Sequence, residues 1–463
     1  MNRVRVVVIG AGSAGTGAAW RAAKCGADVF LLESAPFLGG TSTIGGVHCW
    51  EPGIASNGLN RQLYRHMRKS KNAASVGKTI HPYDSASHIG LNGVLLDEPY
   101  ESTLRRGTLN WQQTARVHFE PTAMAAAMRF ILDESGVTTI CNMACIGAEI
   151  NGEHIVAVRT KDLMTGEEYL LHADVFVDCS ADAVFCRGLN IKTRFGEDCF
   201  DDFLEPSAPR QPTGIVNGVS LCFRVTRGDV GEEAPRWVYD TEASDWIAGK
   251  QLPCSNVNLY PNGDRNYNPL PLMQGAEYFA LVPSERMRIL VARVWLYWEW
   301  MKREHGHRGW HIKKIMARPG VRESWRVCAL EMTTENDLRL GCFRQGDDII
   351  ALGDHTLDTH GERTGQEKLP RELSVPFGVK MGSLIVPVFD NLLVAGRCAG
   401  FSHLAASSCR LSRTMMDIGE AAGALAALGG DMREKGPAPV RSALRFDEYL
   451  DWAESKYPLI GEC

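Results

Sequence analysis

The chain has 463 residues, which predicts two or three domains because single hydrophobic cores stop growing well below that length. Apolar residues make up 44% and charged residues 23%, and the net charge of −5 argues against a protein that coats nucleic acid. No run of about 18 apolar residues occurs, so we expect no membrane span. The absence of a signal-peptide pattern predicts a cytoplasmic protein. The 14 cysteines are scattered without a CxxC pair, which predicts free thiols and no metal site.

The first elements along the chain form a βαβ unit. Residues 4–9 are a continuous apolar run typical of a buried parallel strand, and residues 14–25 form an Ala-rich helix that Gly26 ends. Residues 29–32 predict a second buried strand, which ends at Glu33. The order of strand, helix and strand predicts a parallel sheet.

The middle of the chain begins with a Gly-rich, aromatic loop at 39–58 and a polar, weakly patterned stretch at 70–106. A helix is predicted from Pro121 to Ser135. Strands are predicted over 138–145, 147–151, 154–160 and 168–172, and two X-Gly turns among them indicate a meander. Another buried strand is expected over 174–178.

The composition of the chain after about residue 197 indicates an inserted domain, followed by a segment that belongs to the first domain again. From about Glu197 Pro, Trp and Tyr become frequent, and strands mix with a helix over 285–304. Apolar strands return over 384–395, and an Ala/Gly-rich helix follows over 410–428. We therefore predict a discontinuous Rossmann-type domain of 1–196 and 380–435, an inserted α+β substrate domain of 197–379, and a C-terminal tail of 436–463 with a small helix.

The turn after the first strand has the pattern G-x-G-x-x-G. Gly10 permits a tight turn, Gly12 lets the backbone approach a pyrophosphate, and Gly15 allows close packing of helix on strand. Ser13 and Ala14 begin the helix, whose N-terminal N–H groups favour phosphate. Glu33 can accept hydrogen bonds from ribose hydroxyls and would repel a 2′-phosphate. Together these features predict a dinucleotide site, but they do not choose between NAD and FAD.

The stretch after Glu33 reads Ser-Ala-Pro-Phe-Leu-Gly-Gly-Thr-Ser-Thr. It resembles the two-dinucleotide-binding-domain flavoproteins, in which E-x-x-x-x-x-G-G-[ST] leads from the ribose acid toward the isoalloxazine ring. Gly39, Gly40 and Thr41 match that pattern. Paired glycines let the backbone pass close to a diphosphate or ribityl chain, and Thr41 or Thr43 supplies a hydroxyl.

Three later segments extend the resemblance to the whole chain. Val175–Asp182 resembles the D-A-[TS]-G-D strand and turn at the adenosine end, but Ala181 replaces a glycine and predicts a looser turn. Arg318–Arg326 resembles the R-E-[ST]-R-R element of a bacterial branch loosely labelled xanthan-lyase-like. Asn391–Arg397 resembles that branch's C-terminal FAD strand, which implies that Gly396 and Arg397 lie beside the cofactor. A G-x-A-A-G helix beginning at Gly419 follows. The resemblance implies an α/β fold with a Rossmann-type FAD-binding domain, FAD as cofactor and oxidoreductase activity.

Histidines near these motifs are the candidate acid–base residues, because their pKa values suit proton transfer near neutrality. His48 follows the Gly-Gly-Thr stretch, His403 follows Gly396–Arg397, and His360 forms a D-x-H element with Asp358 that resembles one in the branch. Each of them, like His355 nearby, could instead be a hydrogen-bonded loop residue. A covalent flavin link at His48 or Cys49 is a further alternative.

The chemistry implied is hydride transfer on a small polar organic substrate, hydroxylated or sugar-like. Arg322 either contacts this substrate or pairs with Glu323 across the domain interface. No second G-x-G-x-x-G occurs, so oxygen or a partner protein is expected to take the electrons. Polar residues of the inserted domain either bind substrate hydroxyls or form a solvated loop: Asn256, Asn258, Tyr260, Asn262, Arg265, Asn266 and Tyr267.

Two other functions stay open from the sequence. One is an FAD-dependent nucleic-acid-modifying enzyme, which the charge disfavours. The other is a non-catalytic dinucleotide-binding partner protein. The oligomeric state is open as well, a homo-oligomer included.

Overall fold

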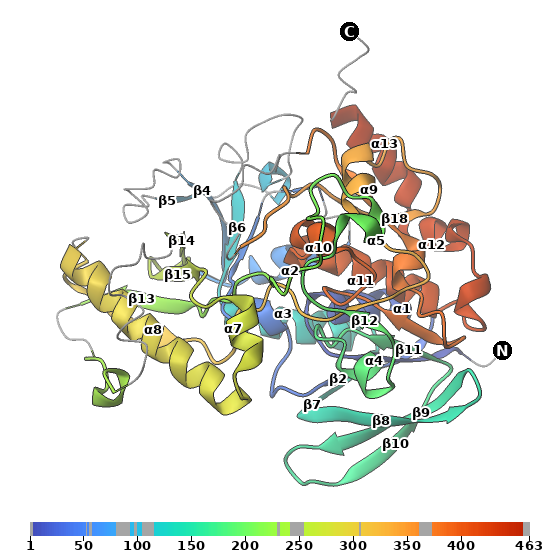
Figure 1. Cartoon of the computed structure of the whole chain (residues 1–463), viewed down its shortest axis with the longest axis horizontal. Coiled ribbons are helices and arrows are strands. Elements are labelled where there is room, and N and C mark those ends of the chain that lie inside the picture. The colour runs from blue at the N-terminus through green and yellow to red at the C-terminus, as the bar shows by residue number, and fades with distance from the viewer. Residues whose placement is uncertain are drawn as a thin grey trace.

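The computed structural model describes residues 3–51, 53–54, 58–79, 93–96, 100–103, 115–228, 232–240, 254–304, 307–360 and 373–456. Two large hydrophobic cores divide these residues (Figure 1). The first core takes buried residues from Val6 to Val440 and is centred on the elements to the right in Figure 1, and a smaller cluster beside it contains Phe446 and Ala453. The second contains the long yellow helix on the left.

A five-stranded parallel sheet forms the centre of the first core. Its strand order is β20-β11-β1-β2-β7, with bounds β1 Arg5–Ile9, β2 Asp28–Glu33, β7 Thr138–Cys141, β11 Val175–Asp178 and β20 Leu392–Val394. All four neighbouring pairs run parallel. The chain builds outward from β1 in one direction through β2 and β7, and in the other through β11 and β20. Ligands bind at such a reversal of strand order, at the carboxyl ends of the strands.

Two helices, α1 (Ser13–Lys24) and α11 (Ser412–Ala426), pack backbone against backbone beside this sheet. A Cβ on Gly419 would lie 2.0 Å from the Ala14 carbonyl oxygen, and one on Gly423 would lie 2.1 Å from the Ala18 oxygen. On the other helix, a Cβ on Gly17 would meet the Met416 oxygen at 2.3 Å. Glycine at these three positions therefore brings a late segment of the chain against an early one.

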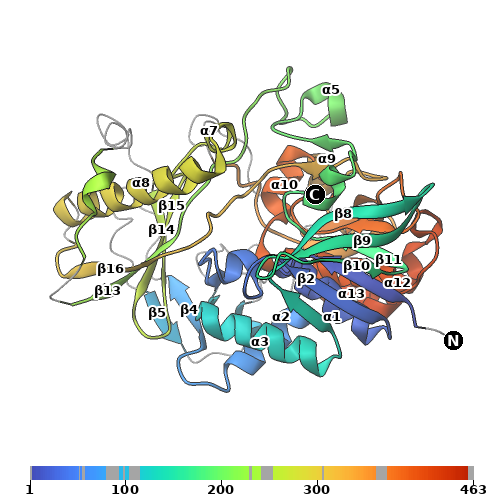
Figure 2. The same cartoon turned by 90° about the horizontal axis from the view of Figure 1, so that it is seen from below.

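A three-stranded antiparallel meander follows β7, as the turn signals predicted. Its strands are β8 (Met143–Asn151), β9 (His154–Asp162) and β10 (Glu168–His172), in the order β10-β9-β8 (Figure 2). The predicted break between its first two strands near Ile146 is wrong. The chain breaks at Asn142, whose φ of 55° ends the parallel strand, whereas residues 145–147 form only a register shift within β8.

The second core packs a long helix on a four-stranded antiparallel sheet. The helix is α8 (Pro283–Glu304), preceded by α7 (Gly275–Ala280). The sheet has the order β14-β15-β13-β16, with bounds β13 Phe223–Arg227, β14 Cys254–Leu259, β15 Arg265–Leu270 and β16 Trp310–Ile315. The buried residues of this core end at Met316, and Val327 to Val379 supply residues to the first core instead. The second core is thus shorter than the insertion expected over 197–379.

A four-stranded sheet that the sequence did not predict lies between the two cores. It has the order β3-β6-β4-β5, with bounds β3 Cys49–Trp50, β4 Ala74–Thr79, β5 Gly93–Leu96 and β6 Arg116–Phe119. Two of its strands fall in the stretch that was only polar and weakly patterned. Its apolar residues Trp50, Val76, Val117 and Phe119 join the first core.

Smaller elements complete the two cores. Two-stranded ladders pair β12 (Thr193–Arg194) with β17 (Arg326–Val327) and β18 (Ile349–Gly353) with β19 (Phe377–Lys380). The remaining α-helices among the described residues are α2 Leu59–Met67, α3 Pro121–Glu134, α4 Val184–Gly188, α5 Phe200–Phe203, α9 Glu335–Leu340, α10 His403–Cys409, α12 Pro437–Leu444 and α13 Phe446–Lys456. The helix expected over 410–428 begins at Ser412, and the tail holds α12 and α13 rather than one small helix. Among the described helices, none has the length and apolar character needed to cross a membrane.

Candidate functional site

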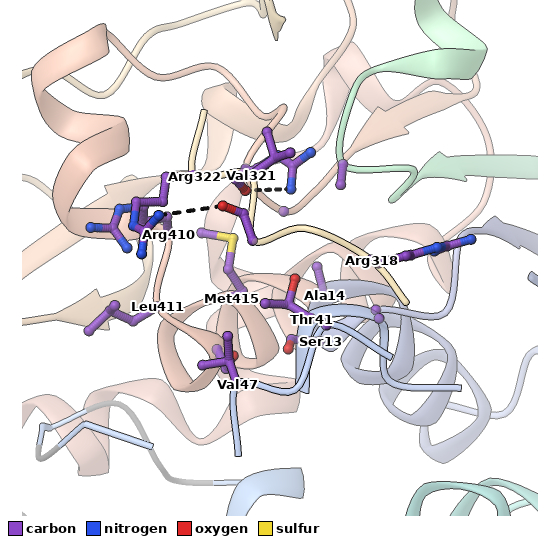
Figure 3. A pocket seen from close by; sticks show the side chains of 18 of the residues that line it. Ser13, Ala14, Thr41, Val47, Arg318, Val321, Arg322, Arg410, Leu411 and Met415 are labelled. Atoms are coloured by element: carbon purple, nitrogen blue, oxygen red, sulfur yellow. Dashed lines mark hydrogen bonds between the residues drawn. The ribbon is translucent and has the colours of Figure 1, made fainter. Parts of the chain in front are cut away.

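A pocket of about 980 Å³ opens at the carboxyl ends of the parallel strands and runs between the two cores. Residues one or two positions after the ends of β1, β2, β11 and β20 line one end of it, among them Gly10, Ser34, Cys179 and Gly396. In Figure 3, Ser13, Ala14 and Thr41 lie together on this side, Arg318 lies toward one end and Arg410 toward the other. A pocket of this size, at the reversal of strand order, suits a large nucleotide ligand together with a small one.

The three motif glycines meet three different constraints. Gly10 has φ of 96°, which L side chains rarely adopt. A Cβ on Gly15 would lie 1.7 Å from the Gly10 carbonyl oxygen, so Gly15 sets the contact between helix and strand and does not line the pocket. A Cβ on Gly12 would meet no atom within 4 Å, because it would project into open space at the first turn of α1. That open space beside helix N–H groups fits a pyrophosphate.

The carboxylate of Glu33 is buried at the edge of the pocket. It accepts hydrogen bonds from the backbone N–H groups of Ala11 and Ala35, each at 2.8 Å. The Arg318 guanidinium lies 3.8 Å from it. The acid predicted for a ribose therefore lines the pocket and also holds the glycine turn in place.

The other predicted cofactor residues divide between the pocket and its support. Gly12, Ser13, Ala14, Gly40, Thr41, Gly396 and Arg397 line the pocket. Gly39, with φ of 101°, and Thr43, whose hydroxyl donates to the Leu38 carbonyl oxygen at 2.6 Å, shape the loop behind it. Gly419 lies away from the lining, in the contact between α1 and α11.

The turn after β11 lines the same end without the glycine that its resemblance led us to expect. Ala181 itself adopts the left-handed conformation, with φ of 69°. The Asp178 carboxylate accepts hydrogen bonds from the N–H groups of Ser180 and Cys186, both at 2.9 Å. The turn is therefore tight, and the looser turn predicted from alanine at 181 is wrong.

At the opposite end, His360, Asp358 and Arg410 form one hydrogen-bonded set. His360 Nε2 lies 2.8 Å from Asp358 Oδ2, and Arg410 donates to the same oxygen at 2.8 Å. Burial lowers the pKa of His360 to about 4, although Asp358 opposes the shift. Burial raises the pKa of Asp358, but His360 and Arg410 outweigh it and hold the value well below its usual range. The histidine is therefore neutral and the aspartate ionised at neutral pH.

His48 and Cys49 also line the pocket. His48 is 0% exposed, stacks on Tyr260 with ring centroids 3.8 Å apart, and donates from Nε2 to the Leu259 carbonyl oxygen at 3.0 Å. Its Nδ1 is buried without a hydrogen-bond partner among the described residues. Burial lowers the pKa of His48 to about 3 and raises that of Cys49 to about 12. Both side chains are therefore uncharged at neutral pH, and the Cys49 thiol has little nucleophilic thiolate.

His403 lies beneath the pocket and not in its lining. It is 1% exposed, and its Nδ1 lies 2.8 Å from the Glu323 carboxylate. Arg322 does line the pocket, and it donates to the Gly218 carbonyl oxygen at 3.0 Å and to Asn268 Oδ1 at 3.4 Å. His355 lines the pocket as well and contacts the Thr356 carbonyl oxygen at 2.9 Å.

Polar side chains on and beside the sheet of the second core form a wall of the pocket. Asn258 and Asn266 lie opposite each other on β14 and β15, and Asn268 lies on the same face two residues further along. All three line the pocket together with Ser220, which donates to Asn268 at 2.6 Å. Tyr260 and Tyr267 are buried instead, and the side chain of Asn256 lies outside the described residues. Sequence analysis missed Asn268, although the alternation Asn-Tyr-Asn at 266–268 carried the signal.

The glycine turn after β1, the acid at the end of β2 and the long pocket between two hydrophobic cores define a dinucleotide-binding protein of the Rossmann class. The chain belongs to the FAD dependent oxidoreductase family, whose model matches residues 5–441. FAD is therefore its cofactor, and its activity is that of a flavin-dependent oxidoreductase. No curated protein matches the chain in sequence.

Several solved structures are similar to this chain. A geranylgeranyl bacteriochlorophyll reductase-like protein from Thermoplasma acidophilum has a TM-score of 0.48 at 11% identity, over 98% of this chain and 84% of its own. A flavin-dependent brominase has a TM-score of 0.46 at 13% identity, over 98% and 84%. A flavin-dependent halogenase has a TM-score of 0.48 at 11% identity, over 98% and 63%.

Proposed function

We propose that the enzyme moves a hydride between FAD and a small hydroxylated organic substrate, with His360 as the base. The observation that carries this proposal is the set of His360, Asp358 and Arg410 at the end of the pocket opposite Glu33. The FAD residues of the first core and this set lie in one continuous pocket. A substrate between them would therefore contact both.

The proposed cofactor contacts follow from the open space in the pocket. The first turn of α1 at Gly12, Ser13 and Ala14 would hold the pyrophosphate, and Glu33 would hold a ribose. Gly40, Thr41, Gly396 and Arg397 would contact the remainder of FAD. Bound FAD supplies the hydride chemistry, so the protein has to bind the substrate, orient it and manage a proton.

His360 suits the proton step because of its orientation. If Nε2 carries a hydrogen and donates it to Asp358, Nδ1 is left as an acceptor. Oxidation of an alcohol to a carbonyl removes a hydride from carbon and a proton from oxygen, and Nδ1 would take that proton. Asp358 would then stabilise the imidazolium, as carboxylates do in other catalytic sets. Arg410 fixes Asp358 through both its carboxylate and its carbonyl oxygen.

The other predicted catalytic residues receive different roles. His48 is the weaker candidate for the base, because its Nδ1 is buried and its Nε2 is already bonded to Leu259. Arg322 holds the amide oxygen of Asn268 at the wall of the pocket. The amides of that wall favour a substrate with several hydroxyl groups. Histidines and arginines in the lining also speak against a non-catalytic binding protein.

The test is anaerobic reduction of the flavin by a panel of hydroxy acids, polyols and sugars. The visible absorbance of the flavin measures its reduction. We expect at least one of these compounds to bleach the flavin, and His360→Gln to slow that reduction about 10²- to 10⁴-fold, the usual range for loss of a general base. Admission of air then separates an oxidase, which reoxidises quickly, from a dehydrogenase that needs another acceptor.

A matched control comes from a second histidine–aspartate pair. His154 Nδ1 also lies 2.8 Å from a carboxylate, that of Asp390, but it is half exposed and away from the pocket. His154→Gln should leave the rate unchanged. Equal rates for His360→Gln and the unaltered enzyme, or no bleaching by any compound of the panel, would refute the proposal.

A further inference from the structure

A buried run of polar contacts leads from His360 to His403. It begins at the backbone of His360, whose N–H donates to Asn217 Oδ1 at 2.8 Å and whose carbonyl oxygen accepts a hydrogen bond from the N–H of Gly218. Both peptide groups of His360 are thus bonded to one dipeptide. The loop that presents the imidazole cannot shift without breaking both bonds.

Asn217 is held in turn by a single carboxylate oxygen. Glu323 Oε2 accepts hydrogen bonds from the backbone N–H of Asn217 at 3.1 Å and from its Nδ2 at 2.9 Å. The second bond fixes which way the amide points, because its nitrogen must face Glu323 and its oxygen must face His360. Asn217 and Glu323 are 2% and 1% exposed, so water does not compete for these bonds.

The other oxygen of Glu323 faces His403 on α10. The Oε1–Nδ1 distance is 2.8 Å, and Arg326 Nε lies 3.4 Å from the same oxygen. Burial raises the pKa of Glu323, but His403 and Arg326 outweigh it and lower the value, so Glu323 stays ionised. A second carboxylate, that of Asp198, accepts a hydrogen bond from the backbone N–H of His403 at 2.7 Å. His403, itself held by Asp198, thus fixes the Glu323 carboxylate from the side of the first core.

We propose that Asn217, Glu323 and His403 are positioning residues that hold His360 against the pocket, an inference that rests on the proposed role of His360. His403 then serves the site without touching a ligand. The run connects three parts of the chain. They are α10 of the first core, the segment at Glu323 between the two cores, and the segment at Asn217 that leads into the second core. The orientation of His360 therefore depends on how the two cores are seated on each other.

The experiment follows the ring of His360 by nuclear magnetic resonance in the FAD-loaded full-length protein, with histidine labelled by carbon-13. Its signal is identified by its absence from His360→Gln. We expect it to titrate at a pKa of about 4 in the unaltered protein. Asn217→Ser removes the two bonds that the amide side chain makes, one to Glu323 and one to the N–H of His360, and keeps the backbone bond to Glu323. It should move that pKa upward toward the ordinary value as the ring gains access to water. The charged groups facing the ring, Asp358, Arg322 and Arg410, are kept in both proteins.

The control is Asn391→Ser. Asn391 is 1% exposed and uses both ends of its amide, accepting from the N–H of Ile155 at 3.0 Å and donating to its carbonyl oxygen at 2.8 Å. It directly precedes β20, at the end of the sheet remote from the pocket. Asn391→Ser should cost similar stability and leave the His360 signal unchanged.

An unchanged His360 titration in Asn217→Ser would overturn the inference. If Asn217→Ser does not fold, Glu323→Gln, which keeps the shape of the side chain, takes its place with the same expected shift. Failure of both to fold while Asn391→Ser folds would assign the run to folding alone and overturn the inference too. The proposed function fails separately, when His360→Gln reduces its flavin at the normal rate.

Discussion

Replacement of Gly12 by valine tests whether the first turn of α1 holds the pyrophosphate of FAD. Because a Cβ at this position meets no protein atom within 4 Å and the backbone has φ of −71°, the fold has room for the side chain. The methyl groups would occupy the space left for phosphate. Each hydrogen bond to a charged group contributes roughly 1.5–3 kcal/mol. Loss of two such bonds would weaken FAD binding by about 3–6 kcal/mol, or roughly 10²- to 10⁴-fold.

A second N-cap glycine supplies the control for this experiment. Gly436 precedes α12 with φ of −88°, and a Cβ there also meets no atom within 4 Å. Valine should cost either N-cap about 0.5–1 kcal/mol. The dissociation constant of FAD is measured by flavin fluorescence on apoprotein, and folding by thermal unfolding of the same samples. Normal FAD affinity in Gly12→Val, or an unfolded Gly12→Val apoprotein beside a folded Gly436→Val, would refute the reasoning.

Two further predictions concern stability. Ala181→Gly should raise the free energy of unfolding by roughly 0.5–1 kcal/mol, because the residue has φ of 69° and the relief of left-handed strain exceeds the added freedom of the unfolded chain. Urea denaturation with saturating FAD measures this, and a loss of stability would contradict it. His48 has a native pKa of about 3 against 6.5 when unfolded, so between these pH values only the unfolded chain takes up its proton. Stability should therefore fall on acidification below pH 6.5 by up to about 1.4 kcal/mol per pH unit from this residue. His48→Gln, whose amide can still donate to Leu259, should show a shallower fall; equal slopes at pH 5–7 would exclude the effect.

The sequence predicted the first βαβ unit because its signals are local. A continuous apolar run, a glycine turn and an acid at a strand end each report on a few neighbouring residues. The constraints on Gly10, Gly12 and Gly15 follow from the same local geometry. The sheet formed by β3 to β6 gave no such signal, because its strands are short and several of them lack a regular alternation of apolar and polar residues.

Spacing along the chain could not predict whether a residue lines the pocket or is buried behind it. His403 follows the Gly396–Arg397 pair closely, yet the turn between them carries it beneath the pocket. His360 lies far from the glycine motif in sequence and reaches the same pocket. Adjacency in sequence also suggested Arg322 as the partner of Glu323. The contacts of the Glu323 carboxylate with His403, Arg326 and Asn217 come from distant or unmarked positions and could not be read from the sequence.

The packing of α11 on α1 has a consequence for biosynthesis. The pocket takes lining residues from Ile9 to Gly53 and again from Gly396 to Met415, so one of its walls is translated long after the other. A nascent chain that has not yet emerged beyond Met415 has the glycine turn but lacks the part of the lining from Gly396 to Met415. We therefore expect the complete FAD pocket to form only after α11 has been synthesised. Cofactor occupancy would then report that the chain has been made and folded through that helix.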